Sequence, residues 1–205
     1  MRRVLVALVV LLLPASLRAD PVTIVNTGPG PSGFPMMGLG GLQWLAVEFD
    51  VSRPDVITGV EGWMLISRGG FLDLVLYTDG GEIPGTELSR QTVRLESAAA
   101  ASWRGVSSGL TWLVAPGTYW VGFEMPLRDV IQAGLPFPSE RPLTNGAIVD
   151  TENEGWYHEA DGAARIGLRI FGAGEEPPTP TPEPGSMLLF ASGLAALAAR
   201  RHRRR

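Results

Sequence analysis

The sequence predicts an all-β protein folded as a jelly-roll-like antiparallel β-sandwich. Apolar and polar residues alternate with a period of two along several short segments, as in strands that bury one face. Gly and Pro, at 26 and 17 of the 205 residues, interrupt the chain at short intervals, which suits the turns between such strands. At least nine of these segments fall within about 150 residues, and this density favours two packed sheets.

The clearest alternation lies at residues 43–51, where Leu45 and Val47 face the same side. This pattern predicts a strand with one buried face. Residues 96–101 are expected to form a helical turn, and residues 126–145 a long loop without regular structure. The other predicted strands lie at residues 22–26, 56–67, 71–78, 87–96, 110–114, 119–125, 147–149 and 165–170.

The first 19 residues have the pattern of a secretory signal peptide. A basic start is followed by an apolar run at residues 4–13, and the small Ala19 precedes the polar Asp20. The apolar run is expected to be helical but is too short for a permanent membrane span. We therefore predict cleavage by signal peptidase between Ala19 and Asp20, with a β-sandwich domain at residues 20–174.

The C-terminal 31 residues fall into three parts. Residues 175–184 form a Pro/Thr-rich linker that favours extended polyproline II structure. Residues 185–205 begin with a short apolar helix over 187–199, which is about 20 Å long and falls short of a 30 Å hydrocarbon core. Arginines then hold that end in the cytoplasm under the positive-inside rule. These are Arg200, Arg201, Arg203, Arg204 and Arg205.

This tail resembles the PEP-CTERM sorting signal of Gram-negative bacteria, with the motif at Pro182, Glu183 and Pro184. The resemblance implies recognition by an exosortase, a membrane transpeptidase-like enzyme. It further implies a precursor held transiently in the inner membrane, removal of the tail, and delivery to the cell surface or the exopolysaccharide matrix. An ordinary C-terminal membrane anchor on a proline-rich stalk remains the alternative.

Two segments of the domain resemble the bacterial surface β-sandwiches called choice-of-anchor domains. Residues 74–88 resemble their strand–turn–strand signature, and residues 113–120 resemble a later turn and strand. The Asp-Gly-Gly and Pro-Gly sequences within the first segment are themselves suited to tight turns. The resemblance implies a surface β-sandwich and names no ligand.

Charge and composition exclude several functions. The whole chain has a net charge of −4, but residues 20–184 contain nine Arg against all 21 acidic residues, a net charge of −12. Such a domain lacks the basic patch that nucleic acid requires, so no nucleic-acid partner is expected. The absence of Cys excludes disulfides, thiolate metal sites and cysteine nucleophiles. No cofactor is expected.

An acidic segment gives a weak calcium candidate at Asp150, Glu152, Glu154 and Asp161. Its spacing and its Gly155 partly match a calcium-binding loop. However, Glu is longer than the Asp or Asn usual at those places, and the neighbouring segments are predicted strands rather than helices. A solvated acidic hairpin loop is the favoured interpretation, so no metal site is assigned.

An aromatic platform for sugar rings could instead form from Trp103, Trp112, Trp120, Trp156 and Tyr157. Trp120, Trp156 and Tyr157 are the candidates, because Trp120 alternates away from its apolar neighbours and the other two adjoin an acidic turn. Aromatic side chains also fill sandwich cores. No Gly-x-Ser-x-Gly nucleophile motif is present, and His158 is expected in a surface turn.

We therefore expect an exported, non-enzymatic protein with a structural or adhesive role at the cell surface. A carbohydrate-binding module that acts on matrix exopolysaccharide is the alternative. A secreted hydrolase is a third hypothesis.

Overall fold

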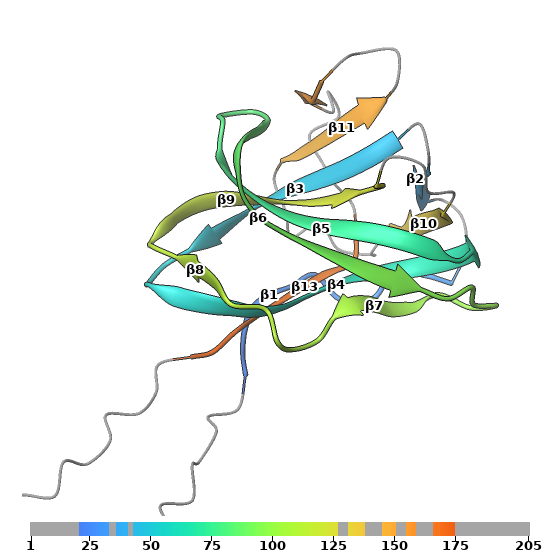
Figure 1. Cartoon of the computed structure of the whole chain (residues 1–205), viewed down its shortest axis with the longest axis horizontal. Coiled ribbons are helices and arrows are strands. Elements are labelled where there is room, and N and C mark those ends of the chain that lie inside the picture. Colours follow the sequence, from blue (N-terminus) through green and yellow to red (C-terminus); the bar gives the residue numbers. More distant parts are fainter. Residues whose placement is uncertain are drawn as a thin grey trace, which may run out of the picture. The chain divides into compact units, whose positions relative to one another are not determined.

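The computed structural model describes residues 21–32, 36–40, 43–126, 131–137, 145–150, 155–158 and 166–174. These residues form two antiparallel sheets, and none of them lies in a helix. The sequence-based prediction of an all-β antiparallel fold is therefore confirmed. Figure 1 shows the sheets as two layers, with β3, β5 and β9 above β4 and β13.

One sheet has seven strands arranged around a long central strand. The path runs β1-β13-β4-β10-β2, and β7 and β8 also pair with β4. With 14 residues, β4 is long enough to pair with β8 at residues 55–57, β13 at 57–62, β7 at 60–64 and β10 at 65–68. The strands are β1 (Val22–Asn26), β2 (Met36–Leu39), β4 (Asp55–Arg68), β7 (Ser102–Val106), β8 (Trp112–Val114), β10 (Gln132–Pro136) and β13 (Leu168–Gly172).

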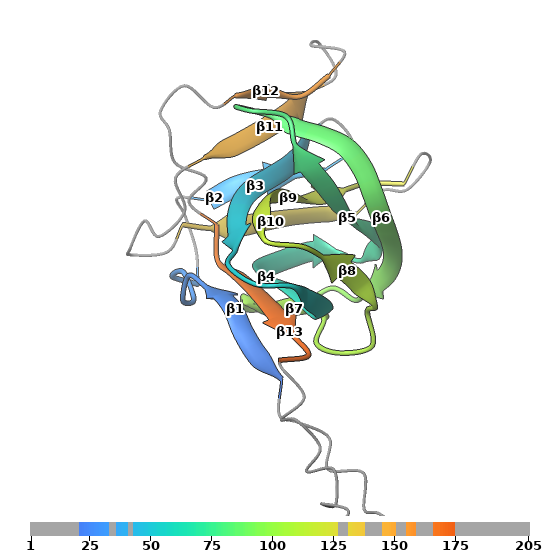
Figure 2. The same cartoon turned by 90° about the vertical axis from the view of Figure 1, so that its left-hand side faces the viewer.

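The other sheet has six strands in the order β12-β11-β3-β9-β5-β6. Its centre is the pairing of β9 with β3 on one side and β5 on the other. The edge strand β6 curves strongly along its length (Figure 2). The strands are β3 (Gln43–Val51), β5 (Gly70–Asp79), β6 (Pro84–Leu95), β9 (Gly117–Glu124), β11 (Gly146–Asp150) and β12 (Tyr157–His158).

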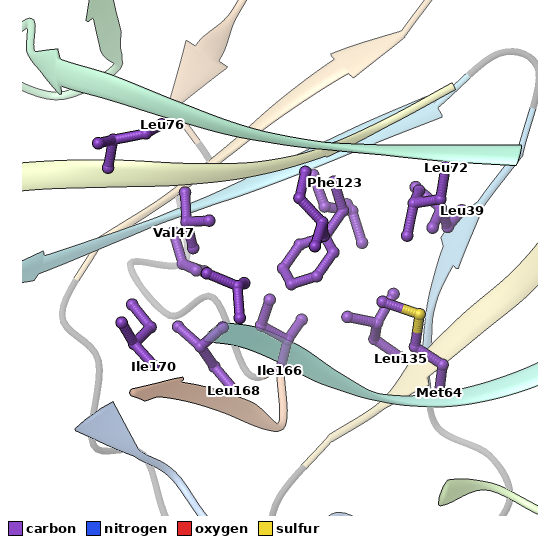
Figure 3. Close-up of a cluster of buried hydrophobic side chains, with 14 of the residues drawn as sticks. Leu39, Val47, Met64, Leu72, Leu76, Phe123, Leu135, Ile166, Leu168 and Ile170 are labelled. Carbon is purple, nitrogen blue, oxygen red and sulfur yellow. The ribbon is translucent and has the colours of Figure 1, made fainter. Parts of the chain in front are cut away.

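The hydrophobic core lies between the two sheets. Val47 and Phe123 of the six-stranded sheet point toward Met64 and Leu135 of the seven-stranded sheet (Figure 3). All four side chains are buried. The alternation that predicted residues 43–51 as a strand places Leu45, Val47 and Phe49 in this core. Burial of these apolar faces is the main favourable contribution to folding.

The first and last strands of the domain are neighbours. β1 pairs with β13, with Val22 opposite Gly172, and Ala173 donates a backbone hydrogen bond to the Val56 carbonyl oxygen. By its internal contacts the chain separates after Gly174, and the unit that begins at Glu175 lies outside the described residues. The chain therefore enters and leaves the folded domain side by side.

Four strands were not predicted from the sequence. β2, β7 and β12 lie outside every predicted strand, although His158 of β12 was expected in a surface turn, and β10 lies within the expected loop at 126–145. The segment at 96–101 contains no helical turn; its Ala98 N–H bonds instead to the Ile66 carbonyl oxygen as the chain crosses toward β7. Tertiary hydrogen bonding outweighs the helix propensity of a four-alanine run there.

The predicted signal helix and C-terminal helix lie outside the described residues. Within the part that the structure describes, no helix is long and apolar enough to cross a membrane.

Candidate functional site

The outer face of the six-stranded sheet carries a polar network built around two buried carboxylates. Asp73 on β5 and Glu124 on β9 are only 6% and 2% exposed. They lie there because their apolar neighbours along the strands, Leu72, Leu74 and Phe123, take the inner positions. We use the name polar network for Asp73, Tyr77, Glu87, Arg90, Thr92 and Glu124.

Arg90 on β6 holds the network together. Its Nη1 lies 2.8 Å from Asp73 Oδ2, and its Nη2 lies 2.9 Å from Glu124 Oε2. Nη2 also lies 2.7 Å from Glu87 Oε2. Thr92 donates to Asp73 Oδ1, and the Tyr77 hydroxyl donates to Glu124 Oε1. Both oxygens of each buried carboxylate therefore have a partner, which is what burial of a charge requires.

The electrostatics of the network follow from burial. Loss of hydration raises the pKa of Glu124, although Tyr77 and Arg90 act in the opposite direction. Burial and the nearby Glu124 carboxylate also raise the pKa of the Tyr77 hydroxyl. The hydrogen bond from Arg90 lowers the pKa of the more exposed Glu87. With their acceptor atoms occupied, the two buried carboxylates act to attach β6 to β5 and β9.

Sequence analysis did not identify this network, because it joins residues up to 51 positions apart that approach one another only after folding. The one usable signal was the placement of Asp73 and Tyr77 at alternate positions among apolar residues. Such polar residues within a strand predict either an exposed face or a buried polar group with partners.

The structure corrects the expectation that Trp120 is exposed. Its indole does face away from the core, as the alternation predicted, but its side chain is fully buried. Ile83 from the β5–β6 turn and Trp156 pack against the cluster that contains it. Its Nε1 lies 3.3 Å from Asp79 Oδ1. A fully buried indole offers no surface for a sugar, so Trp120 is not a stacking platform in this structure.

The other two aromatic candidates are half-buried and lie on different sides of the sheet. Trp156 packs on the outer face, 6.0 Å between ring centroids from Tyr77 and 6.5 Å from Trp44. Tyr157 packs instead against the main core. The structure thus does not bring Trp120, Trp156 and Tyr157 together as one surface. Sugar binding by Trp156 or Tyr157 stays a prediction.

The acidic segment can be placed only in part. Asp150 ends β11, whereas Glu152, Glu154 and Asp161 lie outside the described residues. Among the described residues, no group of three acidic, His or Cys side chains could hold a metal ion. His158 lies half-buried on β12 beside Ala147, and its Nε2 has no hydrogen-bond partner within the described chain. Calcium binding therefore remains untested.

The residues of the sorting signal also lie outside the described residues: Pro182, Glu183, Pro184 and the five terminal arginines. The same holds for the signal-cleavage residues Ala19 and Asp20.

A family model described as the PEP-CTERM protein-sorting motif matches residues 180–205. No curated protein matches the chain. The match covers the Pro-Glu-Pro motif, the apolar segment and the arginines, so the PEP-CTERM motif predicted from the sequence is present. Such motifs are recognised by exosortase, and this one indicates an exported protein with a membrane-anchored precursor.

Proposed function

We propose that this protein is an exosortase substrate whose β domain serves a structural or adhesive role at the cell surface or in the exopolysaccharide matrix. The observation that carries the proposal is the PEP-CTERM match at residues 180–205. The signal-peptide pattern at residues 1–19 supports export and cleavage by signal peptidase. The resemblance to choice-of-anchor domains fits the same location.

The chemistry of the tail supports retention of the precursor in the membrane followed by cleavage at the motif. Pro182 and Pro184 disfavour a helix and leave the backbone extended, in the form that an enzyme cleft can bind. The Glu183 carboxylate resists entry into hydrocarbon and so sets the depth of the motif. The terminal arginines hold the opposite end of the apolar segment in the cytoplasm.

The position of the last strand is compatible with processing after folding. β13 ends at Gly172, ten residues before Pro182. The last strand can therefore pair with β1 and β4 before the tail is cut. Cleavage would then release a finished domain rather than an unfolded chain.

A non-catalytic role for the domain agrees with the polar network. Asp73 and Glu124 are the buried carboxylates of the described chain, and both are held by Arg90. A general acid or base needs a carboxyl group within hydrogen-bond reach of a substrate proton. The oxygens of these two buried carboxylates already bond to Arg90, Thr92 and Tyr77.

The proposal is tested by separating export from tail removal in an exosortase-containing host. We expect Glu183→Ala, or deletion of residues 200–205, to leave export intact while the protein accumulates unprocessed in the membrane fraction. Glu176→Ala, an acidic residue of the same linker outside the motif, is the matched control and should be processed normally. Normal surface delivery of Glu183→Ala in its processed form would contradict the proposal.

A further inference from the structure

The outer face of the seven-stranded sheet carries an aromatic and charged surface, which joins Trp103 to residues that the sequence did not group with it. Trp63 on β4 lies directly opposite Trp103 on β7 in the strand register. Their ring centroids are 5.4 Å apart and the rings are inclined at 69°. Both indoles are partly exposed, and neither belongs to the two buried apolar clusters. These indoles therefore present apolar area to the outside of the sheet.

Arg169 on β13 extends this surface. Its guanidinium carbon lies 3.9 Å from the centroid of the Trp103 ring, so the cation rests on the indole. A guanidinium carries its N–H donors around its rim. The contact therefore holds a group of hydrogen-bond donors beside the tryptophans.

Glu61 supplies acceptors on the same face. It is the cross-strand partner of Arg169 on one side and of Gly105 on the other. Its side chain is partly buried, and loss of hydration raises the pKa of its carboxyl group while Arg169 lowers it. Arg169 and Glu61 thus place one cation and one carboxylate directly opposite each other on neighbouring strands of this face.

Two glycines pack closely against their neighbours beside the indoles. A Cβ at Gly105, where φ is 141°, would lie 2.3 Å from the Val60 carbonyl oxygen. A Cβ at Gly167 would lie 2.4 Å from the Trp63 Cβ. Side chains are excluded at both positions, so Trp63 and Trp103 are bordered by bare backbone. The Trp63 Nε1–H donates to the Pro31 carbonyl oxygen at 3.3 Å, so the segment before β2 also borders this indole.

We propose that this surface, formed by Trp63, Trp103, Arg169 and Glu61, binds a neutral polysaccharide. Sugar rings present apolar C–H faces that can pack on indoles, and hydroxyl groups that can accept from Arg169 and donate to Glu61. The pairing of one cation with one carboxylate leaves the surface without net charge. An anionic polymer would also be repelled by a domain of net charge −12.

This inference goes beyond the proposed sorting function and does not depend on the tail. It also moves the predicted sugar-binding surface from the six-stranded sheet, where Trp120 is buried, to the seven-stranded sheet.

The test is affinity electrophoresis of the exported protein in native gels that contain dextran, xyloglucan or hydroxyethyl cellulose, with alginate as the anionic probe. We expect at least one neutral polymer to retard the wild-type protein. Trp103→Ala should weaken that retardation about tenfold or more, as for a central aromatic contact. Trp103→Phe should restore most of it, which shows that the aromatic ring rather than the fold is at issue.

Leu113→Ala is the matched control, because Leu113 is an 80% exposed apolar residue of the neighbouring strand β8. It should bind like the wild-type protein. All variants should be exported and processed normally, so failure of this inference is distinguishable from failure of the sorting proposal. Retardation by alginate alone, by none of the polymers, or equally for wild type and Trp103→Ala would overturn the inference.

Discussion

Tyr77 and Glu124 are joined by a hydrogen bond on the outer face of the six-stranded sheet, with the tyrosine hydroxyl as the donor. Arg90 holds the other oxygen of the same carboxylate at 2.9 Å. Three carboxylates, those of Asp73, Glu87 and Glu124, thus share one guanidinium. This excess of acidic groups makes the stability of the domain sensitive to pH.

The first prediction concerns Glu124. Its pKa is raised by burial, so the folded protein binds this proton more tightly than the unfolded chain. The free energy of unfolding should therefore fall as pH rises from about 4.5 through the raised pKa, by about 1.4 kcal/mol for each unit between the two pKa values. Urea unfolding between pH 4.5 and 7.5 measures this slope.

Glu124→Gln should remove this part of the slope, because glutamine does not titrate. Glu87→Gln is the control. The pKa of Glu87 is lowered by Arg90, so its contribution to stability is lost only as pH falls below about 4.5, outside the measured range. Identical slopes for wild type and Glu124→Gln would show that Glu124 is not the group that titrates.

A second prediction concerns Arg90. Arg90→Ala leaves Asp73 and Glu124 buried without their cation. Removing one partner of a fully buried pair costs about 3–5 kcal/mol, but the Arg90 side chain is 35% exposed and water screens part of the effect. We expect the free energy of unfolding to fall by about 2 kcal/mol at neutral pH, measured by urea denaturation.

Arg94→Ala is the matched control on the same strand. Arg94 pairs with Glu96, and the side chains are 70% and 75% exposed. Exposed pairs contribute about 0–1 kcal/mol, so this variant should unfold close to the wild-type midpoint. Equal losses for Arg90→Ala and Arg94→Ala would contradict the role given to the polar network.

A third prediction compares two tryptophans that differ in burial. Trp120 is fully buried, so Trp120→Ala should lower the free energy of unfolding by about 3–5 kcal/mol through the cavity it leaves. Trp156 is only half-buried, and Trp156→Ala should cost clearly less. Thermal or urea unfolding of both variants tests this order, and an unaffected Trp120→Ala would show that the indole does not fill that face.

Local pattern was sufficient for several strands. Residues 22–26 and 43–51 were predicted with the bounds they have in β1 and β3, and in β3 the positions Leu45, Val47 and Phe49 alternate into the core. β10 was missed, since Gly134 and Pro136 interrupt any alternation within it. Its pairing with β4 and β2 depends on partners far away in the chain.

The burial of Trp120 could not be predicted from the sequence for a related reason. Alternation correctly places the indole outside the core, but Ile83 and Trp156 close that face from 37 residues earlier and 36 residues later. Likewise, Trp63 and Trp103 become neighbours only through the pairing of β4 with β7, and β7 was not predicted. Residues that meet across non-adjacent segments are invisible to a pattern within one segment.

The central claim, that the tail is a sorting signal which is removed, is tested most directly by the intact mass of wild-type protein recovered from the cell surface. Cleavage before Asp20 and near Pro184 predicts a polypeptide that begins at Asp20 and lacks residues 187–205, with any attached group adding to that mass. Surface protein that still contains residues 187–205 would mean that the tail is a permanent anchor, and the sorting account would be wrong.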